Sequence, residues 1–342
     1  MLVLFSNSKI LKLICTKLFL GLLFCLYTLS STQASETLNI YSTMPEKYSS
    51  KVFEAFTKQT GIKTQVIRLS AGEALARIEA ESRNPQADIL FGGPDEIFEV
   101  AAAQDLLTNL PPAGDGIPER YRSRNEKWHS WGLMPLVFMA NTNFLEKNGL
   151  KAPKSWQDLL NPAYANSLQM ADARTSGTAT ERIYALAALY GETGAFAYQK
   201  QLHKNIQLYT KSGQGGAIPI ATGQAAAGIF YLPDALDTQQ QGYPVIVTYP
   251  EEGTTYGITG VAILKGTRKS DTALKLVNWL ESAEFANVLI INKINYLPLH
   301  RDAHITEPML DISKVKLIDT DMEWRKNKRQ EFIQRWISDI IQ

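Results

Sequence analysis

Cysteine is the residue that this sequence most clearly lacks. Its only two cysteines among 342 residues, Cys15 and Cys25, lie in a leading segment that we expect to be removed. The remaining chain would hold no disulfide, no cysteine nucleophile and no thiolate-bound metal. Such a composition suits an oxidising compartment, where a stray thiol is a liability.

Long hydrophobic runs are also missing, apart from one near the start. Residues 18–29 are apolar, lysines precede them, and the stretch Thr32-Gln33-Ala34 offers small residues for cleavage. This order is typical of a signal peptide, which we predict to span residues 1–34 with cleavage near Ala34. An uncleaved membrane anchor is the alternative. No later stretch approaches the ~20 apolar residues of a spanning helix, so we expect no stable membrane insertion after cleavage.

The chain lacks an excess of charge of either sign. It carries 35 basic and 34 acidic residues, a net charge of +1 at pH 7 that turns slightly negative once the basic leading segment is removed. This balance gives no global attraction to nucleic acid or to an anionic membrane, so we expect no nucleic-acid partner.

Signatures of known enzymes are missing too. The sequence has no nucleophile elbow, no HExxH pair, no Walker loop and no full dinucleotide fingerprint. His300 and His304 are four residues apart, but Pro298 and Pro308 restrict any helix there, so we expect no metal site. We therefore expect a binding protein without a cofactor rather than an enzyme; a secreted hydrolase is the alternative.

What the sequence does contain is an alternation of short apolar strands with amphipathic helices, which is typical of an α/β fold. The expected strands are residues 37–41, 63–69, 87–91, 133–140, 168–171, 225–230, 244–249 and 257–264. The expected helices are residues 46–61, 70–82, 95–104, 155–160, 178–190, 196–204, 272–280, 283–292 and 323–341. The first strands should be parallel, with right-handed crossovers.

Two apolar segments, residues 133–141 and 255–264, look like a pair of hinge strands that carry the chain out of one lobe and back. We predict a discontinuous lobe 1 of residues 35–135 plus 260–342 and an inserted lobe 2 of residues 136–259. Ligands bind outside the carboxyl ends of strands in open α/β sheets, so we expect a ligand cleft between the lobes.

The most informative segment is residues 172–190, where a polar turn opens into an apolar-faced helix. Thr178 and Glu181 stand at capping-box spacing. The first N–H groups of a helix have no partner inside it, and the helix dipole makes that end positive. Hydroxyl groups and a glycine in the turn would let an oxyanion approach these groups, so we predict an anion site here.

Similar loops follow the first three strands. Ser70 and Glu73 form a second capping-box pattern, and Pro94 suits the first turn of a helix. A glycine-rich loop, residues 212–216, precedes another turn. The candidate ligand-binding residues of these loops are Ser42, Thr43, Ser70, Ala71, Gly72, Gly92, Gly93, Thr175, Ser176, Gly177 and Thr178.

Four more residues are candidates from the second lobe. Tyr231 and Asp234 lie just past an expected strand and could offer a hydroxyl and a carboxylate; alternatively, Pro233 and Asp234 only shape a turn. Glu251 and Glu252 lie on the path back to the hinge. One of them could accept hydrogen bonds from a ligand, or both could be solvated.

These motifs resemble a known family. The segments Ala87–Gly93, Ser70–Ile78, Ser176–Thr178 and Lys204–Ile229 are similar to those of periplasmic solute-binding proteins of ABC importers. Within extracellular solute-binding protein family 1, the resemblance is to the branch of ferric-iron and hexose-phosphate binders. It extends over residues 37 to 300 and implies a type II fold of two α/β lobes joined by two strands.

The resemblance also implies a function. It implies a periplasmic location, an ABC permease as partner and a small anionic solute, an organophosphate or phosphonate, as ligand. Ferric binders of this type use adjacent tyrosines where this chain has Phe230-Tyr231, so iron held through Tyr231 is an alternative. A sensor subunit for a membrane histidine kinase is another. Sugar-phosphate binders have a histidine where this chain has Pro233.

Overall fold

The computed structural model describes residues 37–305 and 315–342. The predicted signal peptide, with Cys15 and Cys25, lies outside the described residues. None of the helices within the described ranges combines the length and the hydrophobicity that crossing a bilayer requires.

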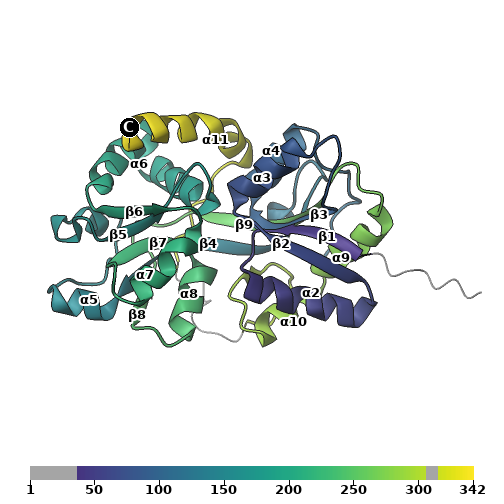
Figure 1. Cartoon of the computed structure of the whole chain (residues 1–342), viewed down its shortest axis with the longest axis horizontal. Helices are drawn as coiled ribbons and strands as arrows, with labels where there is room; N and C mark the ends of the chain where they lie inside the picture. Colours follow the sequence, from purple (N-terminus) through teal and green to yellow (C-terminus); the bar gives the residue numbers. More distant parts are fainter. Residues whose placement is uncertain (1–36, 306–314) are drawn as a thin grey trace, which may run out of the picture. The chain divides into compact units, whose positions relative to one another are not determined.

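The chain begins with three strand–helix units that form a parallel sheet (Figure 1). β1 pairs in parallel with both β2 and β3, as the alternation of elements predicts. The elements are β1 (Thr37–Ser42), α2 (Glu46–Thr60), β2 (Lys63–Arg68), α3 (Ala71–Ala80), β3 (Ile89–Pro94) and α4 (Asp95–Ala103). We call the part of the molecule built on these strands the first half.

A second group of strands continues the sheet, and we call the part built on it the second half. β5 pairs in parallel with β6 and with β7. Its elements are α5 (Thr142–Lys147), β5 (Leu168–Ala171), α6 (Gly177–His203), β6 (Ile206–Thr210), α7 (Ala217–Ala221), β7 (Ala227–Tyr231), α8 (Leu232–Gln240) and β8 (Val245–Thr248).

Two long strands connect the halves. β4 (His129–Asn141) is buried along its whole length and changes partner midway. Its residues 129–135 pair antiparallel with β9 (Tyr256–Ile263), and its residues 136–140 pair with β7. β9 also pairs with β3. The two strands therefore occupy the place predicted for the hinge segments, although the exact division into lobes stays a prediction.

The C-terminal part first returns to the first half and then crosses to the second. α9 (Ser270–Leu280), α10 (Ala283–Ile291) and β10 (Leu297–Pro298) pack against β9, α2 and β4. α11 (Met322–Trp336) then contacts both α4 and α6, and a short π-helical turn (Ile337–Ile341) ends the chain against α6. Figure 1 shows α11 lying over α6, with one end near α4.

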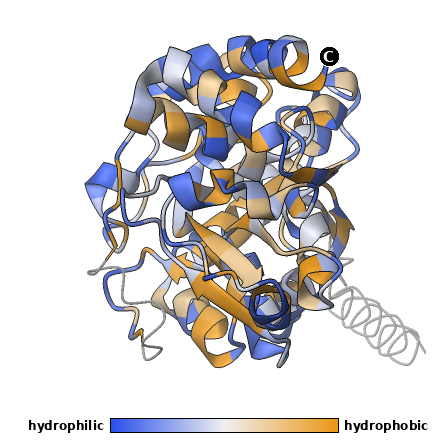
Figure 2. Ribbon diagram, turned by 90° about the vertical axis from the view of Figure 1, so that its left-hand side faces the viewer, coloured by the Kyte–Doolittle hydropathy of each residue, from blue (hydrophilic) through white to orange (hydrophobic). Residues whose placement is uncertain are grey.

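The sheet is covered by apolar cores on both faces because successive side chains of a strand point to opposite sides. In β4, Leu136 and Phe138 enter one core, while Val137 and Met139 enter the other. Figure 2 shows hydrophobic strands inside and helices that carry hydrophilic residues outside. The α/β fold class predicted from the sequence is confirmed.

The predicted elements mostly match, with one helix as the main exception. The two helices expected at 178–190 and 196–204 are a single element, α6, which is kinked at Gly191. The predicted capping box of Thr178 and Glu181 is wrong. Ser176 is the N-cap, and Glu181 is buried against Arg325, whose Nη1 lies 3.0 Å from Oε2 of Glu181. Thr178 already lies inside the first turn.

Candidate functional site

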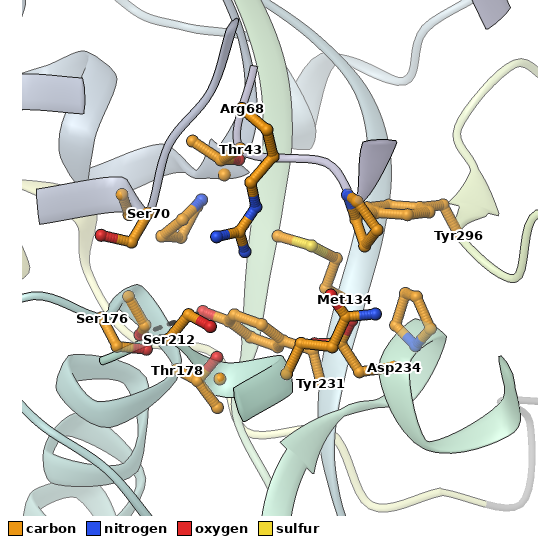
Figure 3. Close-up of a pocket in the computed structure, with 18 residues that line it drawn as sticks. Thr43, Arg68, Ser70, Met134, Ser176, Thr178, Ser212, Tyr231, Asp234 and Tyr296 are labelled. Carbon is orange, nitrogen blue, oxygen red and sulfur yellow. Dashed lines mark hydrogen bonds between the residues drawn. The ribbon is translucent and has the colours of Figure 1, made fainter. Parts of the chain in front are cut away.

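A pocket lies where the two halves meet (Figure 3). Its cavity volume is about 50 Å³, so the two walls lie close together. Its lining from the first half is Thr43, Pro45, Arg68, Ser70, Ala71, Gly93, Pro94, Met134 and Tyr296. Its lining from the second half is Ser176, Gly177, Thr178, Ser212, Gly213, Gln214, Tyr231, Pro233 and Asp234.

The first wall is formed by the carboxyl ends of β1, β2 and β3. Gly92 and Gly93 end β3 with φ of 78° and 82°, a left-handed conformation that favours glycine. A Cβ atom on either residue would lie 3.0 Å from Oγ1 of Thr43. The glycines therefore let the backbone turn tightly behind the threonine that faces the pocket.

The start of α3 contributes Ser70 and Ala71 to this wall. The predicted capping box is confirmed: the Glu73 carboxylate accepts hydrogen bonds from the Ser70 N–H at 3.0 Å and its hydroxyl at 2.8 Å. Hydrogen bonds from Lys211 and from the Ser70 N–H lower the pKa of Glu73 to about 2. The carboxylate thus stays ionised at the positive end of the helix.

The start of α6 forms the opposite wall. Ala179 and Thr180 donate their N–H groups to the Ser176 carbonyl, at 3.1 and 3.3 Å. Gly177 and Thr178 are the first two residues of the helix, so their N–H groups have no acceptor within it. The Ser176 side chain makes no capping bond and lines the pocket beside Thr178.

The two helix starts approach each other closely. The Gly72 N–H donates to the Thr175 carbonyl at 3.2 Å, across the two halves. A Cβ on Gly177 would lie 2.7 Å from Cγ of Pro94. A side chain at Gly72 or Gly177 would therefore push the halves apart, which explains why both positions hold glycine.

Arg68 is a pocket residue that the sequence analysis missed. It ends β2, and its guanidinium group points into the space between the walls (Figure 3). Among the described residues no carboxylate forms an ion pair with it. Only its position at the end of a strand could have identified it, whereas Arg174 lies in the segment predicted from the sequence to hold an anion. The Arg174 guanidinium is already paired with the Asp172 carboxylate.

Asp234 supplies a carboxylate on the other side of the pocket. It lies in the first turn of α8 and is half-buried. Burial raises the pKa of Asp234 to about 7; the charges of Arg68 and Lys47 oppose the rise and that of Asp237 adds to it. The pocket therefore pairs a permanent cation with a carboxyl group that titrates near neutral pH.

Tyr231 closes the inner end of the pocket. Its hydroxyl donates to the Gly177 carbonyl at 3.3 Å. Burial and the nearby carboxylates Glu181, Glu96 and Asp95 raise its pKa well above the usual value. A neutral phenol is a poor ligand for ferric iron. Within residues 37–305 and 315–342 no cluster of three His, Cys, Asp or Glu residues could hold a metal.

Nine of the fifteen predicted residues line the pocket. They are Thr43, Ser70, Ala71, Gly93, Ser176, Gly177, Thr178, Tyr231 and Asp234. Four others lie directly beside lining residues: Ser42, Gly72, Gly92 and Thr175. The structure does not bring Glu251 and Glu252 to the pocket; the Glu252 carboxylate accepts a hydrogen bond from the Trp156 N–H instead, at 3.0 Å. Contact with a ligand stays a prediction for every residue of the set.

Tyr296 and Met134 also line the pocket without having been predicted. Met134 lies on β4, and Tyr296 lies in the segment between α10 and β10. The local sequence does not mark either position, because it does not distinguish a methionine or tyrosine side chain that packs in a core from one that faces a ligand.

Two α/β halves joined by β4 and β9, with a polar pocket between them, are the architecture of a solute-binding protein. The chain belongs to the family of bacterial extracellular solute-binding proteins, which matches residues 41–287. The predicted class, the solute-binding component of an ABC importer, is thereby confirmed. The family is extracytoplasmic by its description, in line with the predicted export.

Two relatives and one structural neighbour show what this chain is similar to. The structure of AfuA from Actinobacillus pleuropneumoniae, with fructose 6-phosphate bound, is 33% identical with a TM-score of 0.85 and covers 90% of this chain and 99% of its own. A putative 2-aminoethylphosphonate-binding periplasmic protein of Salmonella paratyphi A is 28% identical and aligns over 68% of each chain. The ferric binding protein of Campylobacter jejuni shares only the fold with this chain. It is 19% identical, with a TM-score of 0.74, and the match covers 88% of this chain and 98% of its own.

Proposed function

We propose that this protein captures a small organic phosphate or phosphonate in the periplasm and delivers it to an ABC permease. One observation carries the proposal. The starts of α3 and α6 come from opposite halves and, with the guanidinium group of Arg68, surround one pocket. The ligands printed for AfuA and for the Salmonella relative, a sugar phosphate and an aminophosphonate, support the same chemistry.

Each group of the pocket has a distinct part in holding the anion. The N–H groups at the start of α6 and the hydroxyls of Ser176 and Thr178 donate hydrogen bonds to anion oxygens. Arg68 adds a charge-assisted hydrogen bond from the opposite wall, with a geometry suited to two oxygens at once. Asp234, farther along the pocket, accepts hydrogen bonds from the organic part of the ligand.

Binding from both walls couples the ligand to closure. A solute that contacts α3, Arg68 and α6 together interacts more strongly when the halves are close, and so shifts the population toward the closed form. The permease then recognises the closed, loaded protein.

A ligand panel tests the proposal. We expect fructose 6-phosphate or 2-aminoethylphosphonate to raise the melting temperature of the exported protein, and fructose or ethanolamine alone to leave it unchanged. At 100 times Kd the ligand adds about 2.7 kcal/mol to the free energy of unfolding. Native mass spectrometry of protein purified without refolding would identify a retained ligand. A retained metal ion or carboxylate, with no response to any phosphorus compound, would refute the proposal.

Arg68 provides the variant that tests the site itself. We expect Arg68→Met to weaken binding of the active ligand by about 10- to 100-fold, because a hydrogen bond to a charged group contributes roughly 1.5–3 kcal/mol. Arg83→Met is the matched control, since Arg83 is exposed and lies outside the pocket. Calorimetric titration measures both. Equal affinities for the two variants would remove Arg68 from the site.

A further inference from the structure

Helix α8 contacts the first half across the cleft through side chains that have no part in the proposed binding of the ligand. Asp234, Asp237 and Gln240 are spaced three residues apart, so they follow one side of the helix. Asp234 lines the pocket, whereas Asp237 and Gln240 lie beyond it and bind groups of the first half.

Asp237 is the centre of this row. Its Oδ1 accepts hydrogen bonds from the Tyr48 hydroxyl and from the Lys47 ammonium group, both in the first turn of α2. Its Oδ2 accepts a hydrogen bond from the side-chain amide of Gln241, the residue after α8, at 2.9 Å. Tyr48 and Asp237 are only 5% and 6% exposed, so water competes little for this bond.

Gln240 repeats the contact one turn farther along. Its side-chain amide and that of the buried Asn295 exchange two hydrogen bonds, each of 3.1 Å. Asn295 precedes Tyr296, which lines the pocket. The contacts of α8 therefore hold both Asp234 and Tyr296 toward the ligand space.

The halves also meet on the other side of the pocket, where Glu96 of α4 accepts buried hydrogen bonds from the hydroxyls of Thr180 and Tyr184 of α6, at 2.5 and 2.6 Å. Lys211 pairs with Glu73, but the Lys211 side chain is 73% exposed. Exposed ion pairs contribute little, whereas a buried hydrogen bond to a carboxylate contributes substantially. The Lys211–Glu73 pair therefore contributes less to holding the halves together than the buried Asp237 contacts of α8 do.

We propose that Asp237 and Gln240, with their partners Lys47, Tyr48 and Asn295, form a closure zipper that stabilises the closed arrangement without touching the solute. These are positioning residues: they set how often the halves are closed and hence the affinity for any ligand. The inference assumes that the halves close around a solute, as under the proposed function, but it does not depend on the chemistry of that solute.

Distance measurements on the ligand-free protein test the zipper. The chain without its leading segment has no cysteine, so Lys58→Cys on α2 and Lys147→Cys on α5 allow one spin label on each half. We expect a short-distance population in the parent protein. Tyr48→Phe or Asp237→Asn should lower the closed-to-open ratio by about 10-fold or more. In a double-mutant cycle the two substitutions should be strongly non-additive.

Tyr164→Phe is the matched control, because it removes a hydroxyl bonded to the Lys151 carbonyl at 3.0 Å inside the second half. It should leave the distances unchanged, and Lys211→Met should change the closed-to-open ratio by less than about 5-fold. An open parent protein, or equal distances in Tyr48→Phe and Tyr164→Phe, would overturn the zipper. Because no ligand is added, this outcome is independent of whether phosphate esters bind.

Discussion

The charged residues of the pocket show how position changes the chemistry of a side chain. Arg68 stands at the end of β2 and forms no ion pair with a carboxylate of the described residues, while the Arg174 guanidinium is neutralised by Asp172. In the sequence, Asp234 looks like any acidic residue in the first turn of a helix. In the fold, burial gives it a pKa of about 7.

This shift predicts a pH dependence of stability. The pKa of Asp234 rises from 3.8 to about 7 on folding, so between these values the folded protein holds a proton that the unfolded chain has released. Raising the pH through this window therefore lowers the stability. Asp234→Asn should remove that loss, which has an upper limit of about 4 kcal/mol at 1.36 kcal/mol per pKa unit.

Urea unfolding at pH 4.5, 6 and 7.5 measures this effect. The variant should match the parent protein at the lowest pH and exceed it at the highest. Asp115→Asn is the control, because Asp115 is fully exposed and outside the pocket. Parallel stability curves for Asp234→Asn and the parent protein would contradict the assignment.

Helix α11 joins the two halves through a buried arginine, a role that its sequence did not predict. Its Arg325 is 2% exposed and contacts Glu181 on α6 and Asp95 on α4, with Nη1–oxygen distances of 3.0 and 3.5 Å. Burial raises the pKa of Asp95 and that of Glu181, the latter to about 7, while the charge of Arg325 opposes both shifts. One cation of α11 thus neutralises carboxylates that belong to both halves.

Removing that cation should be costly. We expect Arg325→Met to lower the free energy of unfolding by about 3–5 kcal/mol, because it leaves buried carboxylates without a partner. Lys328→Met is the control: its ion pairs with Glu192 and Glu331 are partly exposed, so about 1 kcal/mol or less is expected. Adding Glu181→Gln to Arg325→Met should recover part of the loss. Similar losses for the two single variants in urea unfolding would exclude this role.

The whole molecule is organised around a sheet that does not stop between the halves. Residues 129–135 of β4 pair with β9, and its later residues lie between β7 and β8. One apolar core includes Phe53 of the first half together with Phe196 of the second. The halves therefore share both strands and core.

This continuity predicts cooperative unfolding. Calorimetry should give one transition, and far-UV circular dichroism should have the same midpoint as the fluorescence of the buried Trp131 and Trp156, which lie in different halves. Because the chain has six tryptophans, the difference in fluorescence between the parent protein and Trp131→Phe, or Trp156→Phe, isolates each signal. Two midpoints several degrees apart, one for each tryptophan, would show that the halves unfold independently.

Local sequence patterns predicted most of the elements because each depends on neighbours in the chain. β5 has the predicted bounds, Leu168–Ala171, and the capping box at Ser70 is present. Strand–helix alternation, which is also local, predicted the α/β fold class, and the class of protein followed from the resemblance of several motifs to solute-binding proteins. The same patterns led to nine residues of the pocket.

The tertiary structure decided everything that depends on distant segments meeting. Arg68 and Tyr296 reach the pocket only because β2 and the segment before β10 are brought to the same edge of the sheet. Glu181 is at capping-box spacing in the sequence, yet it is buried by Arg325, 144 residues later. The sequence by itself determined the helices, the strands and the loops that could bind an anion. Which charges are paired, and which remain for a ligand, was decided by burial and long-range contacts that no local pattern contains.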